Sequence, residues 1–386
     1  MQLSNEEEDY NLSLSKFESM LKTNKVLFFD SEEFEEIILH YLDMGKASLA
    51  KKALKLALEQ HPRSTGLKLV QVEMLVYDDK LELAEKLLNE LFAIEPTNEE
   101  IYIQKANICS KRDQHEKAVE LLKIALQYTD DYADVYNLIG MEYLFMDNLE
   151  MAKESFIKCL EEDLEDQSAL YNVVYCFEFL DQNQEAITYL NKYIDKNPYS
   201  EIAWHQLGRL YYGVKEYENA IRAFDYATLI DDEFLGAFME RAKAFERLKK
   251  YEEAIVLLNN AAENGVGFMM SKDVARFILP LAYHLKGDYQ NMSKSIDRAS
   301  KSLLVSDRTM SNYFGLRALY NKEYQKAIEF FTEAMKPVRF LSVSVERPGK
   351  YRFYNNRAQA YIGLNDLPAA KRDYEAALVY NPDYQP

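Results

Sequence analysis

The side chains that could do chemistry in this chain are few, and their spacing builds no catalytic site. Five histidines and three cysteines are scattered over 386 residues. The sequence contains no H-E-x-x-H zinc pair, no C-x-x-C, no G-x-x-x-x-G-K-[ST] phosphate loop and no G-x-S-x-G nucleophile elbow. His205, with Arg209 one helical turn further on, is the nearest to a polar pair, but such a pair is more typical of a surface lining than of a general base. The sequence therefore predicts that the protein is not an enzyme and has no catalytic residue, cofactor or metal site.

The composition predicts a helical protein with a large core. Only 12 glycines and 9 prolines occur, too few for the many tight turns of a β-sandwich or of alternating strands and helices. Apolar residues make up 48% of the chain, which excludes global disorder. The remainder is rich in Glu, Leu, Ala and Lys, which favour helices. We therefore expect an all-α fold.

A repeat of 34 residues organises these helices. One repeat has apolar and small residues at fixed places, which read Trp204-x-x-Leu207-Gly208-x-x-Tyr211 and then Ala220, Phe224 and Ala227. With Glu201 as position 1, steps of 34 keep alanine at position 20 in seven repeats: Ala50, Ala84, Ala118, Ala152, Ala186, Ala220 and Ala254. Positions 8 and 20 are expected to be small because the two helices of a pair would cross there. Such a pair cannot bury its apolar face alone, so neighbouring pairs must stack.

This pattern resembles the tetratricopeptide repeat (TPR), which reads W-x2-L-G-x2-Y, then A-x3-F-x2-A and a closing proline. Proline stands at position 32 in four repeats, as Pro62, Pro96, Pro198 and Pro382. The resemblance covers about nine-tenths of the chain. It implies a right-handed α-solenoid, the TPR superhelix, of about ten stacked antiparallel helix pairs.

The regularity of the repeat sets the domain boundaries that we expect. Residues 1–30 contain an amphipathic helix that would cap the first repeat. Residues 31–268 form seven contiguous repeats of 34 residues. Residues 269–272 are an irregular linker, and residues 273–384 hold three divergent repeats with an insertion at 342–350. The linker is either part of a degenerate repeat or a hinge, and the blocks on its two sides could have separate origins.

The TPR resemblance also implies a binding site in the concave groove, lined by positions 2, 5, 9, 12 and 13 of each first helix. In the central repeats the candidate groove residues are mostly aromatic or cationic: Met141, Phe145, Tyr171, Tyr175, Phe179, His205, Arg209, Tyr212, Lys243 and Arg247. Aromatic rings and methionine suit an apolar partner. The competing interpretation is that tight coiling buries some of these side chains as core.

The function that follows is a non-enzymatic protein-interaction scaffold that binds a peptide or helical segment. The alternative is a peptide-responsive sensor, or an assembly factor or co-chaperone, that flexes near residues 264–272. One TPR variant holds a C-terminal carboxylate between Lys, Asn and Arg side chains of three consecutive repeats. Here Asn107 stands beside Ile103, and Arg352 and Asn356 lack the earlier members of that set. We therefore do not expect chaperone tails to bind by that route.

Charge is distributed unevenly along the chain. Residues 1–262 carry 28 basic and 51 acidic side chains, a net charge of −23, whereas residues 263–386 carry 18 and 13, a net charge of +5. The overall charge of −18 argues against nucleic acid as the partner. A secondary basic patch is expected at Arg339, Arg347, Lys350 and Arg352. It is either a solvated loop or a site for an acidic partner, which includes the acidic block of a second copy.

The sequence also bears on location. It contains no apolar run of about 18 residues that would span a membrane, and its first residues are acidic, unlike a secretory signal. The odd number of cysteines, three, favours free thiols in a reducing compartment. We expect a cytoplasmic protein that does not insert into membranes.

Overall fold

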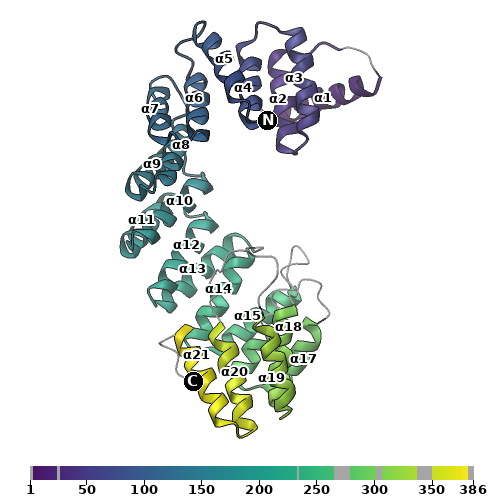
Figure 1. Ribbon diagram of the computed structural model, residues 1–386, viewed down its shortest axis with the longest axis vertical. Coiled ribbons are helices and arrows are strands. Elements are labelled where there is room, and N and C mark those ends of the chain that lie inside the picture. Colours follow the sequence, from purple (N-terminus) through teal and green to yellow (C-terminus); the bar gives the residue numbers. More distant parts are fainter. Residues whose placement is uncertain are drawn as a thin grey trace. The chain divides into compact units, whose positions relative to one another are not determined.

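The computed structural model describes residues 3–23, 27–232, 234–264, 279–300, 307–336 and 350–380. Over these ranges all regular structure is helical and none of it is a strand. The prediction of an all-α protein built from adjacent helix pairs is therefore confirmed (Figure 1). The expected linker at 269–272 lies outside the described residues, as does the insertion at 342–350 up to its last residue. The chain divides into two compact units, residues 1–182 (unit 1) and 183–386 (unit 2).

Seven helix pairs follow one another from residue 31, each with a first helix (A) and a second helix (B). The A helices are α2 (Ser31–Asp43), α4 (Thr65–Tyr77), α6 (Glu99–Lys111), α8 (Tyr132–Phe145), α10 (Gln167–Phe179), α12 (Glu201–Gly213) and α14 (Leu235–Arg247). The B helices are α3 (Ala47–Gln60), α5 (Leu81–Phe92), α7 (His115–Ala125), α9 (Leu149–Glu162), α11 (Asn183–Lys196), α13 (Tyr217–Ile230) and α15 (Tyr251–Asn264). Three residues separate A from B in every pair, too few for B to continue in the direction of A.

The remaining helices lie at the two ends of this series. α1 (Leu3–Thr23) precedes it, and a helical stretch at 279–286 follows it. The C-terminal part then holds α17 (Tyr289–Ala299), α18 (Asp307–Tyr320), α19 (Tyr324–Ala334), α20 (Lys350–Gly363) and α21 (Leu367–Tyr380). α18 with α19, and α20 with α21, are again separated by three residues, so they repeat the same pairing.

A left-handed residue in the turn between A and B makes the reversal possible. It recurs every 34 residues with φ between 55° and 67°, at Gly45, Asp79, Asp113, Asp147, Asp181, Lys215 and Lys249. The C-terminal part has further left-handed residues at Gly287, Lys322 and Asn365, with φ of 81°, 63° and 61°. The next amide closes the end of helix A, as where Lys46 N–H donates to the Tyr41 carbonyl over 2.7 Å. Glycine, asparagine and aspartate tolerate this conformation better than lysine does.

The starts of the A helices are capped by side chains. In five of them the preceding residue accepts a hydrogen bond from a backbone N–H of the first turn: Ser64, Asn98, Asp131, Asp166 and Ser200. Such caps satisfy donors that have no partner within the helix. Caps before A and left-handed turns after it therefore define where each pair begins and bends.

The closest contact within a pair joins position 8 of helix A to position 24 of helix B. A Cβ atom added to Gly140 would lie 2.6 Å from Cε1 of Phe156. Two further pairs repeat this close approach, Gly208 with Phe224 at 2.5 Å and Gly315 with Phe331 at 2.6 Å. The expectation that position 8 faces position 20 is thus corrected, because the nearest neighbour is the ring at position 24.

The residue at position 8 varies in size with the residue at position 24. Where position 24 is leucine, position 8 carries a Cβ or more: Ile38 with Leu54, Val72 with Leu88, Ala106 with Leu122, Val174 with Leu190 and Ala242 with Leu258. Position 20 stays alanine because it is fully buried in its own right, as Ala152 and Ala220 are. Close packing therefore requires glycine opposite these phenylalanine rings, whereas leucine at position 24 leaves room for alanine, valine or isoleucine at position 8.

The N-terminal helix packs on the first pair. Phe17 of α1 is fully buried, with its ring centroid 5.9 Å from that of Phe29 and 6.3 Å from that of Phe34. Met20 of α1 and Tyr41 of α2 belong to the same cluster. The apolar face of α2 that no preceding repeat could cover is therefore covered by α1.

We predict that Gly208→Ala destabilises the protein by about 1–3 kcal/mol, since the added methyl group would overlap the ring of Phe224. This loss should exceed the gain of about 1 kcal/mol that alanine brings to a helix. Phe224→Leu added to Gly208→Ala should recover part of the loss, because the pair then has the composition of Ala106 with Leu122. Thermal and urea unfolding of the wild type and the two variants measure both effects; a neutral Gly208→Ala would contradict the packing account.

Candidate protein-binding surface

The A helices of neighbouring pairs contact one another directly. In unit 1, α2 contacts α4 and α4 contacts α6; in unit 2, α12 contacts α14 and α18 contacts α20. The side chains at positions 2, 5, 9, 12 and 13 of the A helices are called the inner face below, and the inner face of each unit is described by itself.

An aromatic stripe lies on the inner face of unit 1. It is defined by Phe145 on α8 and by Tyr171, Tyr175 and Phe179 on α10, which are 60%, 42%, 43% and 66% exposed. The three α10 rings recur every four residues, and the centroids of Tyr175 and Phe179 are 4.3 Å apart. The opposite side of α10 is buried, and α10 packs against α9. Since α10 is thus apolar on two sides, the core does not account for the exposed rings.

The neighbours of the stripe hold it in place. Phe145 stacks on the ring of His115 with centroids 5.2 Å apart, and His115 Nδ1 lies 2.8 Å from Glu142 Oε2. Met141, another predicted groove residue, is partly buried, and its sulfur accepts a weak hydrogen bond from Asn172 Nδ2 at 3.7 Å. The structure therefore brings all five predicted groove residues of unit 1 onto α8 and α10.

The predicted groove residues of unit 2 are more polar. Arg247 Nε donates a hydrogen bond of 2.9 Å to the hydroxyl of Tyr212, which joins α14 to α12. Arg209 Nη1 donates to Gln206 Oε1 over 2.8 Å. Lys243 and Arg209 are exposed. The inner face of α12 and α14 therefore presents cations beside one tyrosine.

His205 lies within the packing of unit 2. Its side chain is only 9% exposed, its ring lies 4.7 Å from that of Phe234, and its Nε2 lies 3.1 Å from Glu240 Oε2. Burial by itself would raise the pKa of Glu240, but His205, Lys243 and Arg209 hold that pKa below its usual value. His205 thus contacts core rings and a carboxylate, and little of it remains for a ligand.

The predicted basic patch is described only in part. Arg339 and Arg347 lie outside the described residues, as does the side chain of Lys350. Arg352 of α20 forms an ion pair with Glu246 of α14, 106 residues earlier in the chain. Within unit 2, this guanidinium is therefore engaged internally.

Acidic side chains on the inner face of unit 1 were missed by the sequence prediction. Glu73 on α4, Glu100 on α6 and Asp134 on α8 occupy positions 9, 2 and 2 of their repeats. Partial burial raises the pKa of Glu100, and the negative charges of Glu73, Asp134 and Glu99 raise it further, against a 2.7 Å hydrogen bond donated by Gln104. The sequence could have predicted these three residues, because they occupy groove positions of the second to fourth repeats.

In the part of the chain that the structure describes, few other side chains are placed to bind a metal ion or to react. There, no group of three or more His, Cys, Asp or Glu side chains is arranged to hold a metal ion. Nor does any of the described helices combine the length and apolarity needed to cross a membrane. All three cysteines are free, and burial raises the pKa of the Cys176 thiol to about 11.

Comparison with known families gives one consistent result. Profiles described as tetratricopeptide repeat match residues 75–141, 133–166, 168–200, 205–265 and 351–384. Together these matches cover more than half of the chain.

The curated relatives share part of their length with this chain. Anaphase-promoting complex subunit 3 of Schizosaccharomyces pombe is 24% identical over 191 residues, which cover 48% of this chain and 29% of that protein. Hsp70-Hsp90 organizing protein 2 of Arabidopsis thaliana is 26% identical over 208 residues, which cover 46% of this chain and 35% of that protein. The chain thus matches about a third of the length of these relatives.

Two solved structures align with this chain at low identity. The Cut9–Hcn1 hetero-tetramer of the APC/C aligns with a TM-score of 0.46 and 15% identity, covering 99% of this chain and 86% of that one. YrrB, described as a TPR protein with an unusual peptide-binding site, aligns with a TM-score of 0.35 and 16% identity, covering 48% of this chain and 96% of that one.

We predict that Glu100→Gln stabilises the protein at neutral pH. The pKa of Glu100 is raised in the folded state, so the folded protein ionises this carboxyl less readily than the unfolded chain does. The free energy of unfolding is therefore lowered as the pH rises through that pKa. Glutamine carries no such cost, and its oxygen can still accept the bond from Gln104. The gain in melting temperature should therefore shrink as the pH falls from neutral to about 4.

Glu120→Gln is the matched control, because Glu120 is exposed on α7. It should leave the pH dependence of the melting temperature unchanged. A gain from Glu100→Gln that stays constant over this pH range would contradict the account.

Proposed function

The chain belongs to the tetratricopeptide repeat family, and from this premise we propose that it is a non-enzymatic scaffold that binds a segment of a partner protein on its inner face. The main contact is the aromatic stripe of unit 1. The partner segment is a helix or an extended peptide with apolar side chains that cover the rings.

One observation carries this proposal: Tyr171, Tyr175 and Phe179 stay 42–66% exposed on a helix whose other side is already buried. Exposed apolar surface costs roughly 25 cal/mol per Å² relative to the same surface covered. Clusters of exposed rings on a folded surface therefore usually mark a binding site. The spacing of four residues also suits the side-chain spacing of a partner helix.

The charge beside the stripe supports a partner segment that carries basic residues. Glu73, Glu100 and Asp134 lie on α4, α6 and α8, and the pKa of Glu100 is raised first by its partial burial and then by repulsion from Glu73, Asp134 and Glu99. A lysine or arginine of the partner would relieve that repulsion. The proposed ligand is therefore an apolar segment with cationic neighbours.

The inner face of unit 2 offers a second, cationic contact through Arg209, Lys243 and Arg247. It suits an acidic part of the partner, and in a second copy of the chain the acidic N-terminal block would qualify. The proposal does not extend to chaperone tails held by Arg352 and Asn356. Arg352 is paired with Glu246, and Asn356 is only 7% exposed.

We place this scaffold in a reducing compartment, as expected for the cytoplasm. Its three cysteines are free, and Cys159 and Cys176 are fully buried. Burial raises the pKa of both thiols, and Cys159 donates a hydrogen bond to Asp166, so neither is positioned to react with an oxidant.

The test begins with peptides selected from a displayed library on the immobilised full-length chain. Their affinity is then measured by fluorescence anisotropy for the wild type and for the double variant Tyr175→Ala/Phe179→Ala. We expect the double variant to lose about 2 kcal/mol of binding free energy, or about thirty-fold in affinity, because it removes two central rings. The melting temperature should stay within about 2 °C of the wild type, since both side chains are exposed.

Tyr199→Ala is the matched control, because Tyr199 is 79% exposed and lies outside the inner face. It should not change the affinity. Peptides that bind the wild type and the double variant equally would refute the aromatic stripe as the site. Selected peptides without basic residues would refute the charge part of the proposal alone.

A further inference from the structure

A cavity of about 440 Å³ lies between α3 and α4, in the first half of unit 1. Its apolar lining comes from both helices, with Leu54 and Leu58 on α3 and Met74 and Leu75 on α4. Leu54 and Met74 are buried at 7% and 6% exposure. The volume falls within the range of small-molecule sites, about 300–1,000 Å³.

The cavity lies where several other repeats place an aromatic ring. Leu75 stands at position 11 of its repeat, where the next repeat carries Cys109 and the fourth to seventh repeats carry a ring: Tyr143, Phe177, Tyr211 and Phe245. In unit 1 the rings of Tyr143 and Phe177 are buried against the preceding B helix, at 9% and 6% exposure. Leucine is shorter than these rings and leaves the corresponding space between α3 and α4 open.

The lysines at the edge of the cavity also have equivalents that contact those rings. Lys153 lies at position 21 of its repeat, with its Nζ 5.1 Å from the centroid of Phe177. Lys123 lies at position 25, with its Nζ 5.9 Å from the ring of Tyr143. Lys51 and Lys55 occupy positions 21 and 25 of the first repeat. Lysines that elsewhere cover a protein ring therefore line an open cavity here.

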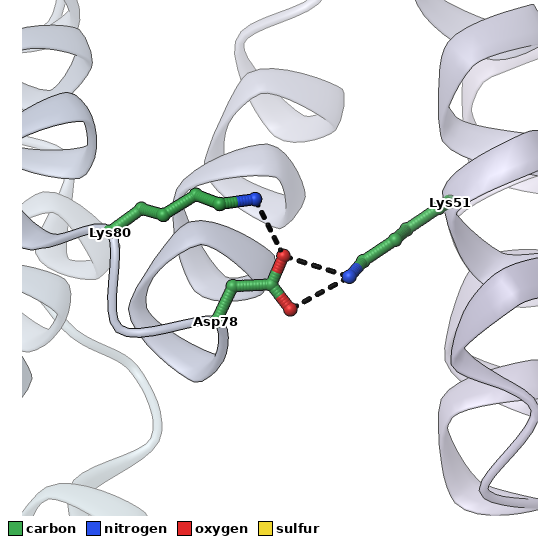
Figure 2. Close-up of polar contacts among 3 residues, drawn as sticks. All are labelled: Lys51, Asp78 and Lys80. Atoms are coloured by element: carbon green, nitrogen blue, oxygen red, sulfur yellow. Dashed lines mark hydrogen bonds and ion pairs between the residues drawn. The ribbon is translucent and has the colours of Figure 1, made fainter.

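The polar edge of the cavity carries a surplus of positive charge. Lys51 Nζ lies 2.7 Å and 2.8 Å from the two carboxylate oxygens of Asp78, and Lys80 Nζ lies 3.0 Å from one of them (Figure 2). One carboxylate thus serves two ammonium groups. With Lys55 and Glu59, the lining holds three lysines against two acids. This is a local exception in a block of the chain whose net charge is −23 over residues 1–262.

We propose that the cavity between α3 and α4 binds an aromatic carboxylate, with the ring between Leu54, Met74 and Leu75 and the carboxylate at the lysines. The ring takes the place that Phe177 occupies at the equivalent junction. The carboxylate adds an acceptor for ammonium groups that now share Asp78. Two sources supply this chemistry: a free aromatic acid, and the C-terminal phenylalanine or tyrosine of a peptide.

The first test is titration of the full-length chain with 3-phenylpropanoate, followed by calorimetry and by the shift in melting temperature. Saturable binding is expected for the wild type. Leu75→Phe should weaken it at least tenfold, because it places a ring where Phe177 lies at the equivalent junction. The melting temperature of unliganded Leu75→Phe should equal or exceed that of the wild type, which shows that the loss is not due to misfolding.

The second test addresses the charge. Lys51→Gln should weaken binding severalfold, whereas Lys52→Gln, an exposed neighbour that does not line the cavity, should not. 3-Phenylpropan-1-ol, which has the ring without the charge, should bind at least tenfold more weakly than the acid. Equal binding of the alcohol and the acid would overturn the assignment of a carboxylate.

The third test separates the two sources. Acetyl-Gly-Phe with a free carboxylate is compared with its C-terminal amide and with 3-phenylpropanoate. Tighter binding of the free-carboxylate peptide supports a chain terminus as the ligand, and tighter binding of 3-phenylpropanoate supports a small acid. No saturable binding of either acid, or equal affinity for Leu75→Phe and the wild type, would overturn the proposal.

Discussion

The contact between position 8 of each A helix and position 24 of its B helix is the constraint on which this structure depends. Where the ring is Phe156, Phe224 or Phe331, it reaches so close to the A-helix backbone that only glycine fits opposite. Where position 24 is leucine, position 8 carries a residue larger than glycine, which fills space that the phenylalanine ring would occupy. The spacing between the helices of a pair is therefore set by side-chain volume, because the backbone hydrogen bonds of a helix are satisfied within it.

Binding chemistry is left to the surface that this packing does not use. On α10 the buried side, with Val173 and Phe177, fills the junction, while Tyr175 and Phe179 stay exposed. Neither ring belongs to this buried side. The inner face can therefore vary between aromatic on α10, acidic on α6 and cationic on α14 without a change of fold, which is why a repeat array specifies a surface rather than a reaction.

Two departures from the repeat show how local substitutions create special features. Leucine in place of a ring at position 11 leaves the space between α3 and α4, and lysines of the repeat pattern border it. Arginine at the start of α20 pairs with Glu246 of α14, so a residue expected in a solvated basic patch becomes an internal contact of unit 2. The first feature can be read from aligned repeats once the register is known. The second cannot, because 106 residues separate the partners.

The sequence by itself determined the helices, their pairing and the 34-residue step, because these depend on residues at fixed short offsets, such as Leu207, Gly208 and Tyr211 within one helix and the alanine that recurs at position 20. It also placed Tyr175 and Phe179 on one helix side. Only the tertiary structure decided which candidate residues stay accessible. His205 is buried beside Phe234 and Glu240, and Arg352 is paired with Glu246. Accessibility depends on which distant side chains packing brings alongside, and no local spacing encodes that.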